Sequence, residues 1–445
     1  MPKTNKQNIM VVVCASSGIN YIEDIRQAGY NPVILELYTQ ESLREAMRKA
    51  LDEEYARIPG ELPVTYAAKE DYADTLEMVR EVAPCAIIPG TDLGIELATR
   101  LAWDLGLPGN DPMIFPWLRE KDKMQLAAKA AGLRYVRGKV VTTVEEGVRF
   151  FKEELGGKSA IVKPLRGSGS QGVAVCLDEE QLRKALSDDL EMVRQMVDPT
   201  SAVLVQERII GEEYYVNTVT LNGETVVTNV VHYDERKLTT ERPVYVCAEM
   251  LQPADARCQM LMDYVVRVVK ATGLEIGPAH TEVMVDEKGP VLIEINARIA
   301  GADQPAGWQD QVLGLHESDI ALRAYLGKDI HQTSYNDHRA VPSANGEYAY
   351  YPLVRSGCYN FAPTLHDIDA EEFIGRDLIE SLPSLHSYKG FEAPKFYPAT
   401  KDLFTITGLV FMVNDSGEQL KKDFQSLLDI EMNHIERLFK IKVKK

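Results

Sequence analysis

The sequence predicts a multidomain protein of mixed α/β and α+β architecture that begins with a doubly wound α/β domain. With 445 residues, the chain is too long for one typical core, so we expect roughly two to four domains. Apolar runs near the N-terminus alternate with helical stretches, which is typical of parallel βαβ units. Toward the C-terminus, alternating stretches at 346–351 and 405–413 precede a predicted helix over 418–439, a pattern that indicates an α+β domain.

The composition is that of a soluble globular protein, with 45% hydrophobic and 26% charged residues. A net charge of −18 argues against a nucleic-acid partner and against an anionic membrane. Six cysteines are scattered without CxxC spacing, which indicates reduced thiols rather than a zinc site or a disulfide framework. No apolar run has transmembrane length, and no signal peptide is recognisable, so we expect a cytoplasmic protein.

The first domain is expected over residues 1–115. Residues 9–15, IMVVVCA, and the apolar run 85–89 are suited to buried parallel strands. The loops that follow, 16–18 and 90–92, would lie at the carboxyl ends of these strands, where such sheets bind ligands. GxGxxG is absent, so the dinucleotide fingerprint is not predicted, and plain turns remain an equal alternative for both loops.

A helix is predicted over 119–131, with Lys121 and Lys123 in its first turn and Gly132 as its stop. Cations at that end oppose the helix dipole, which hints at an anion contact. A second amphipathic helix is predicted over 311–326.

Residues 159–175, SAIVKPLRGSGSQGVAV, combine a strand that ends at Lys163 with a glycine-rich loop and another strand. Glycine allows close backbone approach, so successive N–H groups can point at phosphate oxygens that Lys163 would neutralise. GK[ST] is missing, so the loop is not a Walker loop, and a flexible hairpin is the alternative. The loop residues are Gly167, Ser168, Gly169, Ser170, Gln171 and Gly172.

Residues 203–219, VLVQERIIGEEYYVNTV, predict two strands joined by a short linker. The linker backbone could bind an adenine edge and Glu213 could bind ribose hydroxyls; the alternative is a charged β-turn.

Residues 291–300, VLIEINARIA, have strand spacing that puts Glu294 and Asn296 on one face, with Arg298 near the strand end. The preceding HTEVMVDEKGP predicts an antiparallel partner strand that brings Glu282 beside Glu294. Two carboxylates and an amide oxygen on one face require a counter-ion. Mg²⁺ prefers such oxygens and often keeps a nucleotide phosphate as a further ligand, whereas the alternative is a solvated sheet face.

In this order, the segments REKDKM, VKPLRGSGSQGV, VQERIIGEEY and TEV…LIEINAR resemble the ATP-grasp superfamily over residues 115–300. Within it, HTE and NARIAG resemble carboxylate–amine ligases that make dipeptides, of the bacilysin and dapdiamide type. The resemblance implies an N-terminal α/β domain, an ATP-grasp fold and a C-terminal α+β domain. The implied segments are a pre-ATP-grasp domain (1–115), an A subdomain (116–200), a B subdomain (201–335) and a C-terminal domain (336–445).

The resemblance also implies ATP and Mg²⁺ as cofactors, with Mn²⁺ as an alternative, and assigns most of the site. Lys121 and Lys163 would contact the ATP phosphates, and the loop from Gly167 to Gly172 would cover them. The adenine would contact the backbone of Glu207 and Ile210, and the ribose would contact Glu213.

On the substrate side, the resemblance assigns a pair of Mg²⁺ ions to Glu282, Glu294 and Asn296. Arg298 would face the transferred phosphoryl group, so Arg298, Lys163 and Glu294 are the expected catalytic residues. His280 and the loop from Gly301 to Gly307 would line the substrate pocket. Arg166, just before the glycine-rich loop, could contact either phosphate or substrate.

The implied activity is ATP-dependent formation of an amide through an acyl phosphate, with release of ADP and phosphate. The expected substrates are amino acids, which would give a dipeptide. The partners would be a small carboxylate and an amine, and a homodimer remains open. One alternative is an ATP-grasp ligase of the purine-pathway or carboxylase type. Another is a non-catalytic ATP-binding scaffold.

Overall fold

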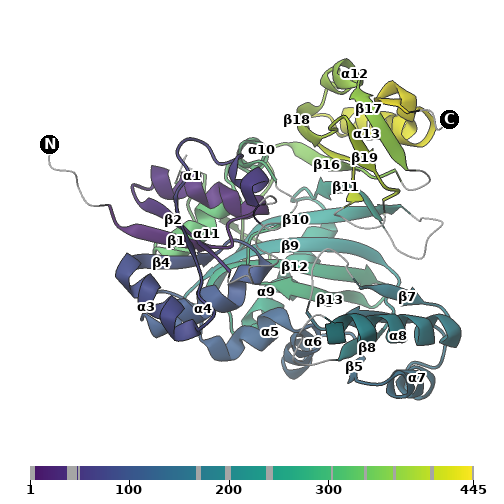
Figure 1. The fold of residues 1–445 in the computed structure, drawn as a ribbon. Helices are drawn as coiled ribbons and strands as arrows, with labels where there is room; N and C mark the ends of the chain where they lie inside the picture. The colour runs from purple at the N-terminus through teal and green to yellow at the C-terminus, as the bar shows by residue number, and fades with distance from the viewer. Residues whose placement is uncertain are drawn as a thin grey trace.

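The computed structural model describes residues 6–37, 48, 51–166, 172–195, 202–236, 244–301, 304–334, 338–363, 367–400 and 405–442 (Figure 1). Four sheets organise these residues: a parallel N-terminal sheet, a small antiparallel sheet, a long curved sheet and a three-stranded C-terminal sheet. Among the described residues, no helix has both the length and the apolar character needed to cross a membrane.

The N-terminal sheet is parallel, with strand order β3-β2-β1-β4, as predicted for a doubly wound domain. The loops after β1 and β4 pack so closely that a Cβ on Gly18 would lie 2.5 Å from the carbonyl oxygen of Gly90. Only glycine fits there, and this packing brings both loops to the same edge of the sheet. The elements are β1 (Asn8–Val12), α1 (Asn20–Gln27), β2 (Asn31–Glu36), β3 (Val64–Ala67), α3 (Tyr72–Val82), β4 (Pro84–Pro89) and α4 (Ile95–Asp104).

A small antiparallel sheet of order β5-β8-β6-β7 lies at the lower right of Figure 1, with α7 and α8 packed against it. Apolar side chains of the sheet and both helices form one core, which fixes the strand that ends near Lys163. The elements are β5 (Gly138–Val141), α7 (Val144–Glu153), β6 (Ala160–Pro164), β7 (Ala174–Cys176), α8 (Glu179–Gln195) and β8 (Val203–Glu207).

The long sheet has the order β13-β12-β9-β10-β11-β16-β20-β18, with the short strands β14 and β15 attached at β10. One face of its first strands packs against α9, through a core that contains Tyr214, Val216 and Ile295. The opposite face is therefore available for a site. The elements are β9 (Glu212–Leu221), β10 (Glu224–Arg236), β11 (Val244–Met250), α9 (Ala256–Thr272), β12 (Ile276–Asp286), β13 (Gly289–Asn296), β14 (Val341–Pro342) and β15 (Tyr348–Ala349).

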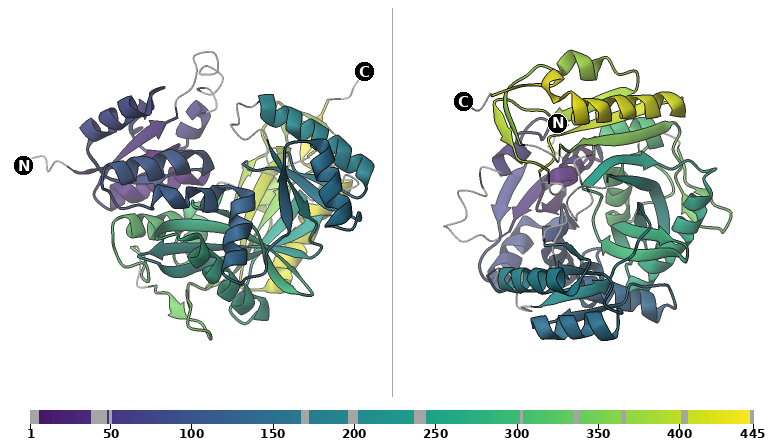
Figure 2. Two further views of the ribbon diagram at one scale, coloured as in Figure 1. Left: turned by 90° about the horizontal axis from the view of Figure 1, so that it is seen from below. Right: turned by 90° about the vertical axis from the view of Figure 1, so that its right-hand side faces the viewer.

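The C-terminal residues continue the long sheet and add a small sheet of order β19-β17-β21. Figure 2 shows α13 along the outer side of this region. The elements are β16 (Arg355–Phe361), β17 (Ile368–Phe373), α12 (Arg376–Glu380), β18 (Leu385–Gly390), β19 (Lys395–Tyr397), β20 (Gly408–Asn414), α13 (Gly417–Asn433) and β21 (Phe439–Ile441).

The helix predicted over 119–131 is wrong at its start, because the structure has two helices there. The helix α5 (Phe115–Arg119) ends before Glu120, whose extended backbone (φ −95°, ψ 119°) turns the chain into α6 (Lys121–Ala130). Lys121 therefore opens a helix, and its backbone N–H donates to the carbonyl of Leu165 beside the glycine-rich segment.

Two other predicted helices are also wrong in extent. The stretch 311–326 is broken at Gly314 (φ +69°) into α10 (Ala306–Leu313) and α11 (Glu317–Tyr325). The helix predicted over 418–439 ends at Asn433, because Phe439 is buried as part of β21 beside β17. Tertiary packing overrides helical periodicity at both places.

The buried His316 joins the N-terminal domain to the start of α11. His316 Nε2 lies 2.8 Å from Asp24 Oδ1 of α1, and His316 Nδ1 lies 2.7 Å from Asp310 Oδ1. Burial alone would lower the pKa of His316. The hydrogen bonds and charges of Asp24 and Asp310 outweigh this effect and raise the pKa to about 10.

We expect His316→Gln to destabilise the protein at pH 7 by roughly 3–5 kcal/mol, the order of magnitude of such a shift. Because the folded-state pKa is raised, the stabilisation is complete below about pH 6.5 and disappears as the pH rises through about 10. Urea denaturation from pH 6 to 10 measures this, with the exposed His434→Gln as control. A wild-type stability that does not fall toward pH 10 relative to the variant would contradict the prediction.

Candidate active site

The open face of the long sheet carries polar side chains in two rows across β9, β12 and β13. The register aligns Asn217, His280 and Asn296 in one row. The next row contains Tyr215, Glu282 and Glu294. The predicted pairing of Glu282 with Glu294 through the turn at 286–289 is thus present.

A β-bulge shapes the metal strand at this point. Glu282 pairs with Glu294 but Val283 pairs with Leu292, so Ile293 is an extra residue on β13. A bulge bends its strand and redirects side chains, and bulges are frequent beside active sites. Ile293 is partly exposed, and both it and Ile209 of the linker after β8 pack against the cluster of Val136, Met284 and Val291.

Two lysines from different elements lie near these carboxylates. Lys121 is buried, and its Nζ lies 3.1 Å from Glu294 Oε1. Lys163, on β6, is also buried, and burial first and the charge of Lys121 second lower its pKa to about 8. Within the described part of the chain, the ammonium group of Lys163 forms no hydrogen bond and no ion pair. The two antiparallel sheets therefore bring cations and carboxylates together.

The oxygen donors on β12 and β13 fit a hard divalent cation. Asn296 is buried, and its Oδ1 has no hydrogen-bond partner among the described residues. Burial raises the pKa of Glu282, but the hydrogen bond and charge of His280 and the charges of Arg298 and Lys121 bring it below its ordinary value. An ionised carboxylate and an unsatisfied amide oxygen are donors that Mg²⁺ accepts. No group of three or more His, Cys, Asp and Glu side chains suited to a metal occurs in the described ranges.

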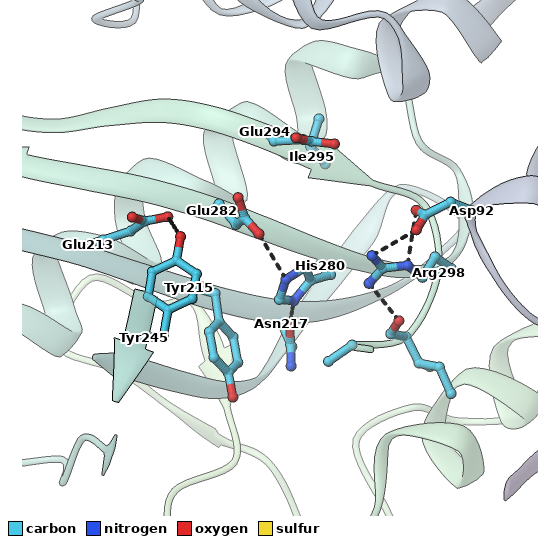
Figure 3. Close-up of polar contacts among 12 residues, drawn as sticks. Asp92, Glu213, Tyr215, Asn217, Tyr245, His280, Glu282, Glu294, Ile295 and Arg298 are labelled. Atoms are coloured by element: carbon cyan, nitrogen blue, oxygen red, sulfur yellow. Dashed lines mark hydrogen bonds and ion pairs between the residues drawn. The ribbon is translucent and has the colours of Figure 1, made fainter. Parts of the chain in front are cut away.

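Arg298 is held by the N-terminal domain (Figure 3). Its Nε donates to Asp92 Oδ1 (3.0 Å), its Nη2 to Asp92 Oδ2 (3.1 Å) and its Nη1 to the carbonyl of Ile299 (2.9 Å). Burial opposes ionisation of Asp92, but Arg298 holds its pKa below the ordinary value. The sequence identified only the loop 90–92 and missed Asp92 as the partner, since 206 residues separate the pair.

His280 is connected to a buried carboxylate that the sequence did not identify. Its Nδ1 donates to Asn217 Oδ1 (2.7 Å), and its Nε2 lies 3.6 Å from Glu282 Oε1. Asn217 Nδ2 in turn donates to Glu317, which is 3% exposed and also accepts from Asn229 Nδ2 and the N–H of Ala300, both at 3.0 Å. We call Glu317, Asn217, Asn229 and Ala300 the Glu317 cluster. A glutamate in an amphipathic helix gave no signal for this role.

The predicted adenine and ribose residues lie around the linker between β8 and β9. The carboxylate of Glu207 accepts a hydrogen bond from Arg137 Nε (2.9 Å). The backbone N–H of Glu207 donates to the carbonyl of Arg137. The side chain of Ile210 is 72% exposed, whereas Glu213 is buried and accepts from the hydroxyl of Tyr245 (2.8 Å). The backbone role of the first two residues and the ribose role of Glu213 remain predictions.

The glycine-rich loop is described only at its two ends. The predicted residues Gly167, Ser168, Gly169, Ser170 and Gln171 lie outside the described residues, whereas Gly172 is described and has φ +67°. Arg166, just before the loop, donates to Glu120 Oε1 (2.6 Å).

The predicted substrate loop, Gly301 to Gly307, contacts the N-terminal domain through two of its carbonyl groups. The carbonyl of Gly301 accepts from Ser17 Oγ (3.2 Å), and the carbonyl of Gln304 accepts from Asn20 Nδ2 (3.1 Å).

Lys163 on the small antiparallel sheet and Lys121 at the start of α6 face carboxylates on the long sheet, an arrangement typical of ATP-grasp folds. Residues 157–305 match the family described as the ATP-grasp domain, so the chain carries this domain. The predicted fold class and the predicted resemblance to ATP-grasp carboxylate–amine ligases of the dapdiamide and bacilysin type are confirmed.

Among similar proteins, Dapdiamide A synthase of Enterobacter agglomerans is 28% identical over 276 residues, which cover 61% of each chain. A carbamoyl phosphate synthase large chain of Thermus thermophilus is 26% identical over 359 residues, 76% of this chain and 32% of that one. This chain thus spans less than two thirds of either relative. An L-amino acid ligase structure from Bacillus licheniformis superposes with a TM-score of 0.70 at 17% identity, covering 96% of this chain and 98% of that chain.

Proposed function

We propose that the protein is an ATP-dependent carboxylate–amine ligase that forms an amide, with amino acids as substrates and a dipeptide as product. The observation that carries this proposal is the row of Glu282 and Glu294 beside Lys121, with Asn296 at the end of β13 and Arg298 two residues beyond it. The similarity to Dapdiamide A synthase and to an L-amino acid ligase supports the same class.

In this proposal, ATP lies between the two sheets. Lys121 and Lys163 bind its phosphates, the backbone at Glu207 and Ile210 contacts adenine, and Glu213 contacts the ribose. Glu282, Glu294 and Asn296 would hold Mg²⁺, or Mn²⁺, whose charge offsets that of the phosphates when it is bound.

A carboxylate is a poor acylating agent because its leaving group would be oxide. Its oxygen therefore attacks the γ-phosphorus of ATP, the bond to the bridging oxygen breaks, and ADP leaves. The amine then attacks the carbonyl carbon of the acyl phosphate, phosphate leaves, and the amine loses a proton. Such chemistry requires positioning and charge neutralisation rather than a protein nucleophile. His280, Arg298 and Gly301 line the substrate end.

We propose a cytoplasmic protein whose four segments have boundaries near residues 115, 200 and 335. A homodimer is compatible with this proposal.

The test is a product analysis with paired carboxylates and amines. We expect ADP and phosphate as nucleotide products, together with new amides by mass spectrometry. Hydroxylamine in place of the amine should trap the acyl phosphate as a hydroxamate. AMP and pyrophosphate would contradict the acyl-phosphate step, and tight ATP binding without amide or hydroxamate across a broad screen would favour a nucleotide-binding scaffold.

The depressed pKa of Lys163 predicts a pH dependence of nucleotide binding. A polyphosphate stabilises the protonated lysine, so affinity is highest below about pH 8 and falls as the pH rises above it. We expect roughly tenfold weaker MgATP binding at pH 9 than at pH 7.5, measured by calorimetry. The Lys163→Met variant should bind MgATP weakly at both pH values. Lys139 is exposed, so Lys139→Met should bind MgATP as wild type does. A steep pH dependence retained by Lys163→Met would contradict this assignment.

A further inference from the structure

Arg119 is a buried arginine whose charge is not matched by a direct partner. It is the last residue of α5 and is 8% exposed. Within the described ranges it forms no hydrogen bond and no ion pair, and its Nη1 is fully enclosed without an acceptor. Enclosing a guanidinium group without acceptors is costly, so a buried arginine of this kind indicates an anion that binds there.

The surroundings of Arg119 place it at the candidate active site. It precedes Lys121 by two residues, and Lys121 contacts Glu294. The helix α5 packs against β13, the strand that carries Glu294 and Asn296. The positive charge of Arg119 also acts on Asp92, whose pKa it helps to lower after the larger effect of Arg298. Arg119 is thus near both the phosphate-side lysine and the Asp92–Arg298 pair.

Arg298, the arginine that the sequence assigned to the phosphoryl group, is partly occupied by protein acceptors. Two of its nitrogen atoms donate to Asp92, as Figure 3 shows, and a third donates to the carbonyl of Ile299. An arginine has five N–H donors in a planar fork that suits phosphate and carboxylate oxygens. Arg119 retains this fork without acceptors among the described residues, so it is better suited than Arg298 to receive an oxyanion.

We infer that Arg119 is an anion-binding residue that contacts the phosphoryl group as it passes from ATP to the substrate carboxylate. This inference rests on the proposed function for the identity of the reaction. The guanidinium group binds the phosphoryl oxygens, and Asp92 keeps Arg298 in place beside it.

Inorganic phosphate is a suitable probe, because it is the group that remains after transfer. Calorimetry would measure phosphate binding to the full chain saturated with MgADP, for wild type, Arg119→Gln and Arg119→Lys. We expect Arg119→Gln to weaken phosphate binding at least tenfold, and Arg119→Lys to weaken it less, while MgADP affinity changes less than threefold. The control is Arg257→Gln, since Arg257 is partly exposed and paired with Asp255.

Thermal unfolding gives a second measurement that does not depend on turnover. Phosphate should raise the melting temperature of wild type and of Arg257→Gln more than that of either Arg119 variant. Unchanged phosphate binding in a folded Arg119 variant, or no phosphate binding by wild type with MgADP, would overturn the inference. If a carboxylate but not phosphate depended on Arg119, the phosphoryl contact would also be refuted. Arg119-dependent phosphate binding without ligase activity would instead refute the proposed function alone.

Discussion

Glu294→Gln is expected to reduce turnover by at least ~100-fold while leaving the fold intact, since metal charge stabilisation contributes several kcal/mol to such reactions. Glu294 lies opposite Glu282 and 3.1 Å from Lys121 Nζ. The amide of glutamine has nearly the same shape but removes one negative charge, which weakens the hold on both the cation and the lysine. Circular dichroism and a steady-state assay of ADP release would measure the two effects separately.

The matched control is Glu287→Gln, in the exposed turn of the same hairpin. It removes the same charge from the same structural unit without touching the polar face, so its turnover should be near that of wild type. A Glu294→Gln enzyme with near-normal turnover at saturating Mg²⁺ would contradict the metal role. A comparable loss in Glu287→Gln would point to a defect of the hairpin instead.

The polar face of the sheet could be predicted from the sequence because its determinants are local. Alternation indicates which side chains share a face, and the short turn after Asp286 sets the register of the hairpin as far as Val283 opposite Leu292. The bulge at Ile293 could not be predicted, although the pairing depends on it. Without the extra residue, Glu282 would lie opposite Ile293, and Glu294 would lie on the other face of the sheet.

Other parts of the site could not be predicted because they depend on contacts between distant segments. Arg298 meets Asp92 across 206 residues, and Glu317 meets Asn217 across 100. The break between α5 and α6 has a similar origin. Periodicity continues through Glu120, but the extended backbone there separates Arg119 from Lys121 and allows both to approach the site from different helices. The residue pattern within one segment does not indicate which distant segment packs against it.

The Glu317 cluster leads to a second large expected effect. Glu317→Ala would leave three buried N–H donors without their carboxylate, on Asn217, Asn229 and Ala300. Each unsatisfied buried donor costs about 1–3 kcal/mol, so three of them together account for several kcal/mol. We therefore expect Glu317→Ala to lower the free energy of unfolding by about 3–5 kcal/mol, measured by urea denaturation.

The same variant should also affect turnover in the molecules that remain folded. Asn217 positions His280 beside Glu282, and the N–H of Ala300 fixes the segment that follows Arg298, so both sides of the polar face depend on Glu317. Glu317→Gln keeps one acceptor oxygen and should cost less, about 1–3 kcal/mol. Exposed Glu153→Ala on α7 serves as the control and should change stability little. If Glu317→Ala were as stable as this control, the amide donors would have other acceptors, and Glu317 would not be what holds His280 and the end of β13 in place.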